Sequence, residues 1–138
     1  AQLVLTPHQR EWQVLSGLDL TSQGAEETGE ALKSFPSGTI LVQKGPATRI
    51  WQAGQADCYQ LSVGGPYQAT GGMGDTLAGM IAGFAGQFPQ VSLYERVTVA
   101  THLHSAIAQE LAEDNYVVLP TMISQQIPAF MKNIQKDT

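Results

Sequence analysis

A cluster of glycines that runs directly into a helix is the feature that most constrains this chain. Residues 69–79 read ATGGMGDTLAG, and the small residues after Asp75 predict a helix that begins at that aspartate. The first N–H groups of a helix have no acceptor within it, and glycines let a ligand approach the backbone, so the segment predicts an anion pocket. A carboxylate beside a bound phosphate is repelled unless it takes a proton from an attacking group. The segment therefore indicates phosphoryl transfer rather than phosphate binding alone.

Length and composition predict one globular domain. The chain has 138 residues, of which 43% are hydrophobic and 14% charged. A net charge of −5 argues against nucleic acid or an anionic membrane surface as the main partner. No apolar stretch is long and continuous enough to predict a membrane span, and no signal peptide is visible. The single cysteine excludes an internal disulfide and favours a reducing compartment, so we expect a cytoplasmic protein.

The hydrophobic pattern predicts strands in the first half of the chain and helices in the second. We expect strands at residues 3–5, 39–43, 49–52 and 58–63, and helices that begin at Pro7 or span residues 25–35, 75–86, 92–115 and 120–132. This order predicts an α/β layered fold with a partly parallel sheet. Ligands of such sheets bind at the carboxyl ends of strands, so the loops that follow the predicted strands are expected to face one crevice.

Two further segments follow predicted strands and carry side chains suited to a ligand. His8 lies in the run TPHQRE after the first strand and can donate a hydrogen bond to a polar molecule. The run KGPAT at residues 44–48 follows the second strand. Its backbone turn can lie along a nucleotide, with Thr48 as a hydroxyl donor.

Each of these segments also has a purely structural interpretation. The glycine run can be an ordinary surface loop, and an aspartate at a helix start interacts favourably with the helix dipole. His8 can be a surface histidine at a helix start, and Lys44 can be a solvated lysine in a hairpin turn. The residues taken one at a time leave both interpretations open.

The other histidines, the cysteine and the tryptophans predict structural roles. His102 and His104 are two residues apart on a predicted helix, so they face different directions and do not suit a shared metal ion. Cys58 lies in a predicted strand, where it would act as a small hydrophobic residue. Trp12 and Trp51 are expected to pack in the core. No metal site made by protein side chains is predicted.

Taken in order along the chain, the three segments resemble a known family. The order TPHQRE, KGPAT and ATGGMGDTLAG resembles the ADP/ATP-dependent NAD(P)H-hydrate dehydratases, the YjeF carboxy-terminal domain family of the ribokinase-like superfamily. The resemblance covers nearly all of the chain but only about half of the family's domain. It implies that residues 1–138 are the carboxy-terminal portion of one ribokinase-like domain, with the upstream half missing. The implied fold is a layered sandwich with a central, mostly parallel sheet and helices on both faces.

The resemblance also implies an activity and a set of roles. The family phosphorylates the ring hydroxyl of hydrated NADH or NADPH (NADHX or NADPHX) with ADP or ATP and Mg²⁺, then eliminates phosphate, and its members commonly form homotetramers. Asp75 would be the base that contacts this hydroxyl, and His8 would contact the hydrated substrate. The nucleotide would be held by Lys44, Gly45, Pro46, Ala47, Thr48, Gly65, Ala69, Thr70, Gly71, Gly72, Met73 and Gly74.

Two other functions remain open at this point. A small-molecule kinase of the same superfamily, acting on a vitamin precursor or a sugar, would carry a similar Gly-x-Gly-Asp motif. The Thr6-Pro7-His8 segment favours the dehydratase over such a kinase. A nucleotide-binding module that has lost catalysis is the other alternative, and it would bind nucleotide without turnover.

Overall fold

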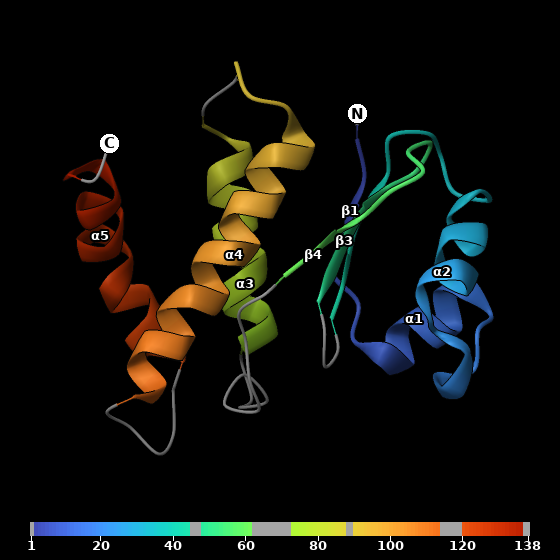
Figure 1. The fold of residues 1–138 in the computed structure, drawn as a ribbon, viewed down its shortest axis with the longest axis horizontal. Coiled ribbons are helices and arrows are strands. Elements are labelled where there is room, and N and C mark those ends of the chain that lie inside the picture. The colour runs from blue at the N-terminus through green and yellow to red at the C-terminus, as the bar shows by residue number, and fades with distance from the viewer. Residues whose placement is uncertain (1, 45–47, 62–72, 88–89, 114–119, 137–138) are drawn as a thin grey trace. The chain divides into compact units, whose positions relative to one another are not determined.

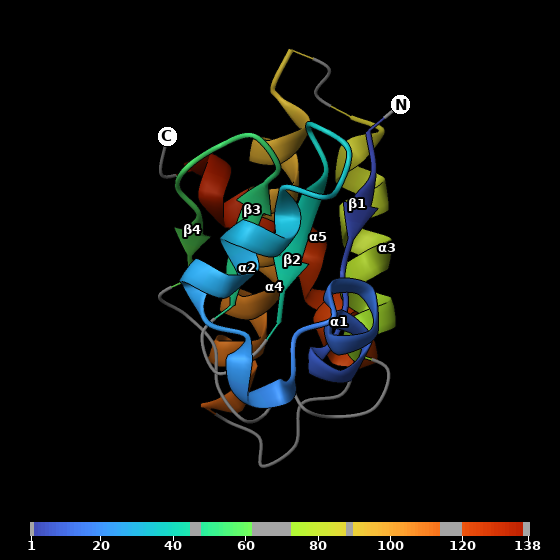
Figure 2. The ribbon, with the colours of Figure 1, turned by 90° about the vertical axis from the view of Figure 1, so that its right-hand side faces the viewer.

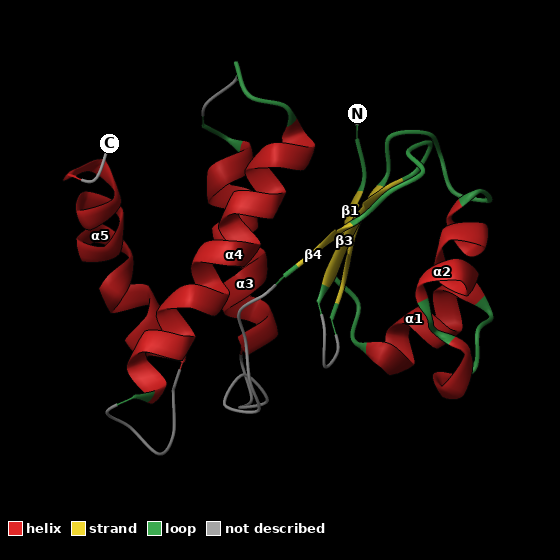
Figure 3. Cartoon of the chain, in the orientation of Figure 1, coloured by secondary structure: helices red, strands yellow, loops and turns green. Residues whose placement is uncertain are grey.

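The first half of the chain mixes strands and helices, whereas the second half is helical (Figures 1 and 3). The computed structural model describes residues 2–44, 48–61, 73–87, 90–113 and 120–136. The chain forms two units, Ala1–Ser62 and Val63–Thr138. The α/β expectation is therefore confirmed, with the sheet confined to the first unit among the described residues.

The first unit is built on a sheet with the strand order β1-β2-β3-β4. Its strands are β1 (Val4–Leu5), β2 (Ile40–Gln43), β3 (Arg49–Gln52) and β4 (Tyr59–Gln60). β1 pairs with β2 in parallel, with Leu5 opposite Leu41, whereas β2–β3 and β3–β4 are antiparallel. The expectation of a mostly parallel sheet is thus wrong for these strands. The connections between β2, β3 and β4 contain only a few residues, and a parallel pair needs a much longer crossover.

Two helices lie together on one side of this sheet, as Figures 1 and 2 show. These are α1 (Gln9–Ser16) and α2 (Ala25–Leu32), separated by the short 3₁₀ helix η1 (Leu20–Ser22). They are long enough, together with their loops, to provide the crossover between the parallel strands β1 and β2.

The core between helices and sheet forms around two tryptophans. Trp12 of α1 and Trp51 of β3 are buried in one cluster with Leu32 and Leu41, and Phe35 packs against this cluster. The rings of Trp12 and Phe35 stack with their centroids 5.7 Å apart. Their burial confirms that both tryptophans are packing residues.

Helix α1 begins at Gln9 and not at the expected Pro7. The intervening His8 has extended backbone angles and forms the N-cap of the helix. Pro7 disfavours helical geometry at Thr6, the residue before it, so a helix that begins only at Gln9 is compatible with this proline. At the other end, Gly17 has a φ of 79° and its N–H donates to the carbonyl of Gln13, which closes the helix.

The second unit contains three helices among its described residues. They are α3 (Met73–Ala85), α4 (Leu93–Ala112) and α5 (Pro120–Lys136), and α4 packs against both α3 and α5. Ser92 caps α4 by accepting a hydrogen bond from the N–H of Glu95. Arg96 donates to the carbonyls of Ala85 and Gln87, which places a positive charge at the negative end of α3.

No helix among the described residues is both long enough and apolar enough to cross a membrane.

We expect Trp12→Ala to lower the free energy of unfolding by about 3–5 kcal/mol, because it removes a large side chain from a well-packed cluster. Chemical denaturation followed by circular dichroism measures this change. Val14→Ala on the same helix is the matched control, since Val14 is 85% exposed, and its effect should stay within about 0.5 kcal/mol. Equal losses in the two variants would show that the Trp12 cluster is not the core of this unit.

Candidate functional site

Three strands of the sheet end at the same edge, and each is followed by one of the predicted binding segments. β1 and β2 run in the same direction, so His8 and Lys44 leave the sheet at one edge. β4 also runs in this direction, because it is antiparallel to β3, which is antiparallel to β2. β4 therefore ends at the edge where β1 and β2 end. The strand directions agree with the expected arrangement of the three preceding strands, and the shared crevice stays a prediction.

Thr48, the last residue of the second predicted segment, is hydrogen-bonded to Leu61. Its backbone carbonyl accepts a hydrogen bond from the N–H of Leu61 at 2.9 Å, which joins the start of β3 to the end of β4. The last residue of the predicted nucleotide segment is thus hydrogen-bonded to the residue that follows β4. The Thr48 side chain is half-buried at this point.

His8 is exposed and belongs to a complete capping box at the start of α1. Its Nδ1 accepts a hydrogen bond from the N–H of Glu11 at 3.2 Å, and its own backbone N–H donates to Oε1 of Glu11 at 3.0 Å. Oε1 of Glu11 also lies 3.1 Å from Nε2 of His8. The structural interpretation of His8 at a helix start is therefore confirmed. It does not exclude a role in binding, because 61% of the side chain is exposed.

The cap selects one tautomer of the His8 ring. Nδ1 can accept a hydrogen bond only when it carries no proton, so the neutral ring carries its proton on Nε2. This Nε2–H is a hydrogen-bond donor at the carboxyl edge of the sheet. In this tautomer the Nε2–H, which lies near the Glu11 carboxylate, can donate to a polar ligand group.

The surroundings of Glu11 change the pKa of its carboxyl group. Its pKa lies below the ordinary value, mainly because the backbone N–H of His8 donates to the carboxylate. Desolvation is the next largest effect and raises the pKa, whereas the weaker charge effects of His8 and then Lys44 lower it. Lys44 therefore contributes least of the four causes to the pKa of Glu11.

A buried amide that the sequence did not reveal lies directly before Lys44. Oε1 of Gln43 accepts a hydrogen bond from the indole N–H of Trp51 at 3.1 Å. Its Nε2 donates to Oγ1 of Thr28 at 2.8 Å and to the carbonyl of Gln23 at 2.9 Å. Gln43 ends a strand whose other residues are apolar. This polar residue in an apolar strand was the one feature of the sequence that could have indicated a buried hydrogen-bonded amide.

The catalytic candidate Asp75 is the third residue of α3 and not its first. The helix begins at Met73, so Met73, Gly74 and Asp75 form its first turn. The N–H groups of a first turn have no acceptor within their own helix, so these three residues carry the donors expected of an anion pocket. The other predicted nucleotide contacts, Gly45, Pro46, Ala47, Gly65, Ala69, Thr70, Gly71 and Gly72, lie outside the described residues.

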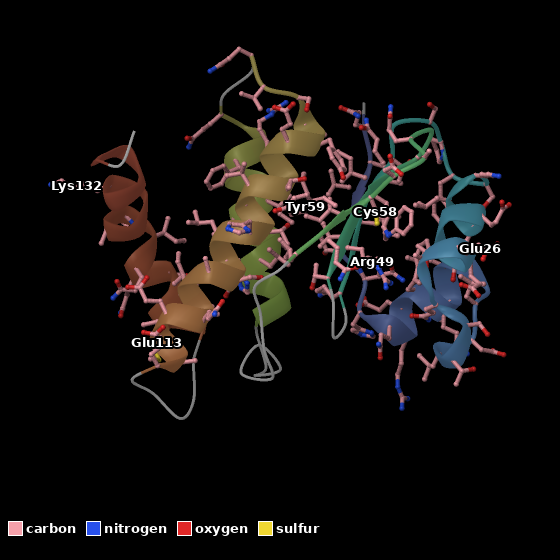
Figure 4. The ribbon with its side chains drawn as sticks, in the orientation of Figure 1. Glu26, Arg49, Cys58, Tyr59, Glu113 and Lys132 are labelled. Atoms are coloured by element: carbon pink, nitrogen blue, oxygen red, sulfur yellow. The ribbon has the colours of Figure 1, made fainter. Side chains whose placement is uncertain are left out.

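The remaining candidates for chemistry among the described residues are Cys58 and possible metal ligands. Burial raises the pKa of the Cys58 thiol, and the nearby Arg49 offsets this only in part. Cys58 packs against the tryptophan cluster on the side of the sheet that faces α2 (Figure 4). Among the side chains that the structure describes, no three of His, Cys, Asp or Glu come together as metal ligands.

The lowered pKa of Glu11 predicts how acid affects this unit. The ionised carboxylate stabilises the fold above its ordinary pKa of 4.5, and this contribution is lost as the pH falls through the lower pKa of the folded state. Glu11→Gln should therefore cost stability at pH 7 and show a smaller further loss in acid than the wild type. Glu110→Gln, an exposed residue on α4, is the control. Parallel curves of unfolding free energy against pH for wild type and Glu11→Gln would contradict this account.

Comparison with known proteins identifies the family. Residues 1–129 match the NAD(P)H-hydrate dehydratases. The ADP-dependent (S)-NAD(P)H-hydrate dehydratase of Streptococcus pneumoniae is 72% identical over 134 residues, which are 97% of this chain and 46% of that protein. The enzyme of the same name from Staphylococcus aureus is 42% identical over 134 residues, again 46% of its length. The chain spans about half the length of the curated relatives it matches.

Solved structures agree with this assignment. A ribokinase-like superfamily protein from Enterococcus faecalis superposes with a TM-score of 0.85 at 45% identity, covering 94% of this chain and 44% of that one. The ADP/ATP-dependent NAD(P)H-hydrate dehydratase of Bacillus subtilis, co-crystallised with ATP/Mg²⁺, gives a TM-score of 0.81 at 28% identity and covers 94% and 47% of the two chains. The chain has a ribokinase-like fold and belongs to the NAD(P)H-hydrate dehydratase family.

Proposed function

We propose that the protein carrying these residues repairs hydrated NADH or NADPH by nucleotide-dependent dehydration. The observation that carries this proposal is the common sheet edge, from which the His8, Lys44 and glycine-rich segments all depart. A donor at His8, a cation at Lys44 and a helix first turn that contains Asp75 are the groups needed to bind a hydroxylated ring and a nucleotide. Membership of the family is the independent support.

In this proposal Asp75 acts as the base in the first chemical step. The ring hydroxyl oxygen forms a bond to the terminal phosphorus of the nucleotide, and the bond from that phosphorus to the bridging oxygen breaks. The proton of the hydroxyl passes to the Asp75 carboxylate. The N–H groups of the first turn of α3 stabilise the negative charge on the phosphoryl oxygens.

Elimination of phosphate completes the reaction. The lone pair of the ring nitrogen expels the phosphate with its bonding electrons. Loss of a proton from the adjacent ring carbon then restores the dihydropyridine. Phosphate is a far better leaving group than hydroxide, so this step needs the protein mainly to hold the ring in place. In this proposal the Nε2–H of His8 donates to the hydrated substrate and orients it.

The nucleotide is proposed to lie along residues 44–48 and the glycine-rich segment. Lys44 and the backbone N–H groups would meet its phosphates. Mg²⁺ bound to the nucleotide neutralises phosphate charge when present. In this proposal phosphate oxygens and water supply most of the ligands of this ion, as Mg²⁺ favours.

ADP is the nucleotide that we propose as phosphoryl donor. The relatives from Streptococcus pneumoniae and Staphylococcus aureus are described as ADP-dependent, whereas the more distant Bacillus subtilis protein is described as ADP/ATP-dependent. The transfer from ADP leaves AMP as the product. We further propose the complete ribokinase-like sandwich, with helices on both faces of its sheet, and a homotetramer.

A direct assay tests the proposed function. The complete natural polypeptide is incubated with NADHX or NADPHX, Mg²⁺, and either ADP or ATP, and the return of dihydronicotinamide absorbance is followed. We expect the signal to return with ADP and AMP to accumulate in step with it. Nucleotide binding without return of absorbance would instead identify a binding module. Phosphorylation of a sugar or vitamin precursor with no effect on NADHX would identify a kinase.

We expect Asp75→Asn to reduce turnover by about 10²-fold or more, the usual contribution of a general base. The variant should still bind nucleotide, because the first-turn N–H groups of α3 are unchanged. Asp57→Asn is the matched control, since Asp57 is an exposed acid in the turn before β4. Turnover of Asp75→Asn close to that of the wild type would remove Asp75 as the base.

His8→Asn separates the two roles of His8. Asparagine is among the best N-cap residues, so the free energy of unfolding should change by less than about 1 kcal/mol. The imidazole Nε2–H is lost, so we expect a higher KM for the hydrated substrate and an unchanged KM for ADP. If both constants keep their wild-type values, His8 is a helix cap and nothing more.

A further inference from the structure

The side-chain amide of Gln43 is buried and fully hydrogen-bonded. Gln43 is the last residue of β2, is 6% exposed and has three hydrogen bonds. Both N–H groups of its amide have an acceptor, and the amide oxygen has a donor, so the amide can take only one orientation. The next residue is Lys44. The strand end that presents Lys44 therefore has a fixed direction.

The hydrogen bonds continue from Gln43 to the other binding segment. The carbonyl of Gln23 accepts from Nε2 of Gln43, and the side chain of Gln23 donates to the carbonyl of Gln9 at 2.8 Å and to that of Leu18 at 3.3 Å. Gln9 is the first residue of α1 and follows His8 directly. An unbroken chain of polar contacts thus joins the residue before Lys44 to the residue after His8.

From this arrangement we infer that Gln43 is a positioning residue that sets the distance between the nucleotide segment and the substrate segment. The inference rests on the proposed function, in which Lys44 meets the nucleotide and His8 meets the hydrated ring. Phosphoryl transfer requires the ring hydroxyl and the terminal phosphorus to lie in line and within contact distance. A scaffold that joins both binding segments maintains this alignment. Gln43 itself does not touch either substrate.

A purely structural role for Gln43 predicts a different outcome. An apolar residue of similar shape fills the same space, and loss of its hydrogen bonds would then lower stability alone. A positioning role predicts in addition that the segments on either side loosen together. Local loosening is measurable as amide hydrogen exchange, even in a protein that remains folded.

The test compares Gln43→Met with Leu32→Val in the complete polypeptide. Gln43→Met keeps the length of the side chain and removes the amide. Leu32→Val trims the same tryptophan cluster and leaves the amide contacts intact. Hydrogen exchange by mass spectrometry reports peptides that cover residues 8–12 and 40–48. Titration calorimetry with ADP and steady-state kinetics report Kd, KM and kcat.

We expect Gln43→Met to speed exchange in both peptides and to weaken ADP binding by about tenfold, equivalent to about 1.4 kcal/mol. Leu32→Val should leave ADP binding and the exchange of residues 40–48 unchanged. Thr28→Val removes only one partner of the amide and should give a smaller change of the same kind. If Gln43→Met does not fold, the same measurements on Thr28→Val and Leu32→Val are compared. A larger change in exchange and ADP affinity for Thr28→Val would support the positioning role, and equal changes would overturn it.

Unchanged exchange in either peptide would overturn the inference, as would loosened peptides with wild-type ADP affinity. Equal effects of Gln43→Met and Leu32→Val would also overturn it, because they would reduce Gln43 to a core residue. Failure of the proposed function would give a different result, because the wild type itself would then not convert NADHX. The exchange experiment would still show whether Gln43 couples the two segments.

Discussion

The parallel pairing of β1 with β2 is the constraint on which the candidate site depends. It places Leu5 opposite Leu41 and thereby brings the residues after both strands to one edge. A slip of one residue would turn Leu41 away from the tryptophan cluster and move Lys44 relative to His8. The apolar cluster and the binding segments are therefore fixed by the same register, so burial of the core also aligns the site.

Polar residues at the ends of elements connect this core to function. His8 satisfies the first turn of α1 and holds its remaining N–H at the sheet edge. Gln43 ends β2 and satisfies groups from α2, β3 and the loop before α2. Free donors and acceptors concentrate where helices and strands end, so the groups that complete the fold are also those placed to meet ligands.

Local sequence patterns predicted most elements but not their arrangement. The strands at Ile40–Gln43 and Arg49–Gln52 were predicted to within one residue, because their apolar residues follow a strand pattern. The start of α3 was placed two residues late, since Asp75 is as favourable within a first turn as at its beginning. The mostly parallel sheet was wrong for the described strands. Gln43 was missed because its partner Thr28 lies 15 residues away.

By itself, the sequence determined the family and the order of the three motifs that identify it, because motifs of this kind depend on residue type and spacing along the chain. It also determined that Trp12 and Trp51 would be buried, since large apolar side chains gain most from leaving water. Only the tertiary structure decided that hydrogen bonds through the Gln43 amide and Gln23 connect the residue before Lys44 with the residue after His8. These relations depend on strand direction and register, which arise from contacts between residues far apart in the chain.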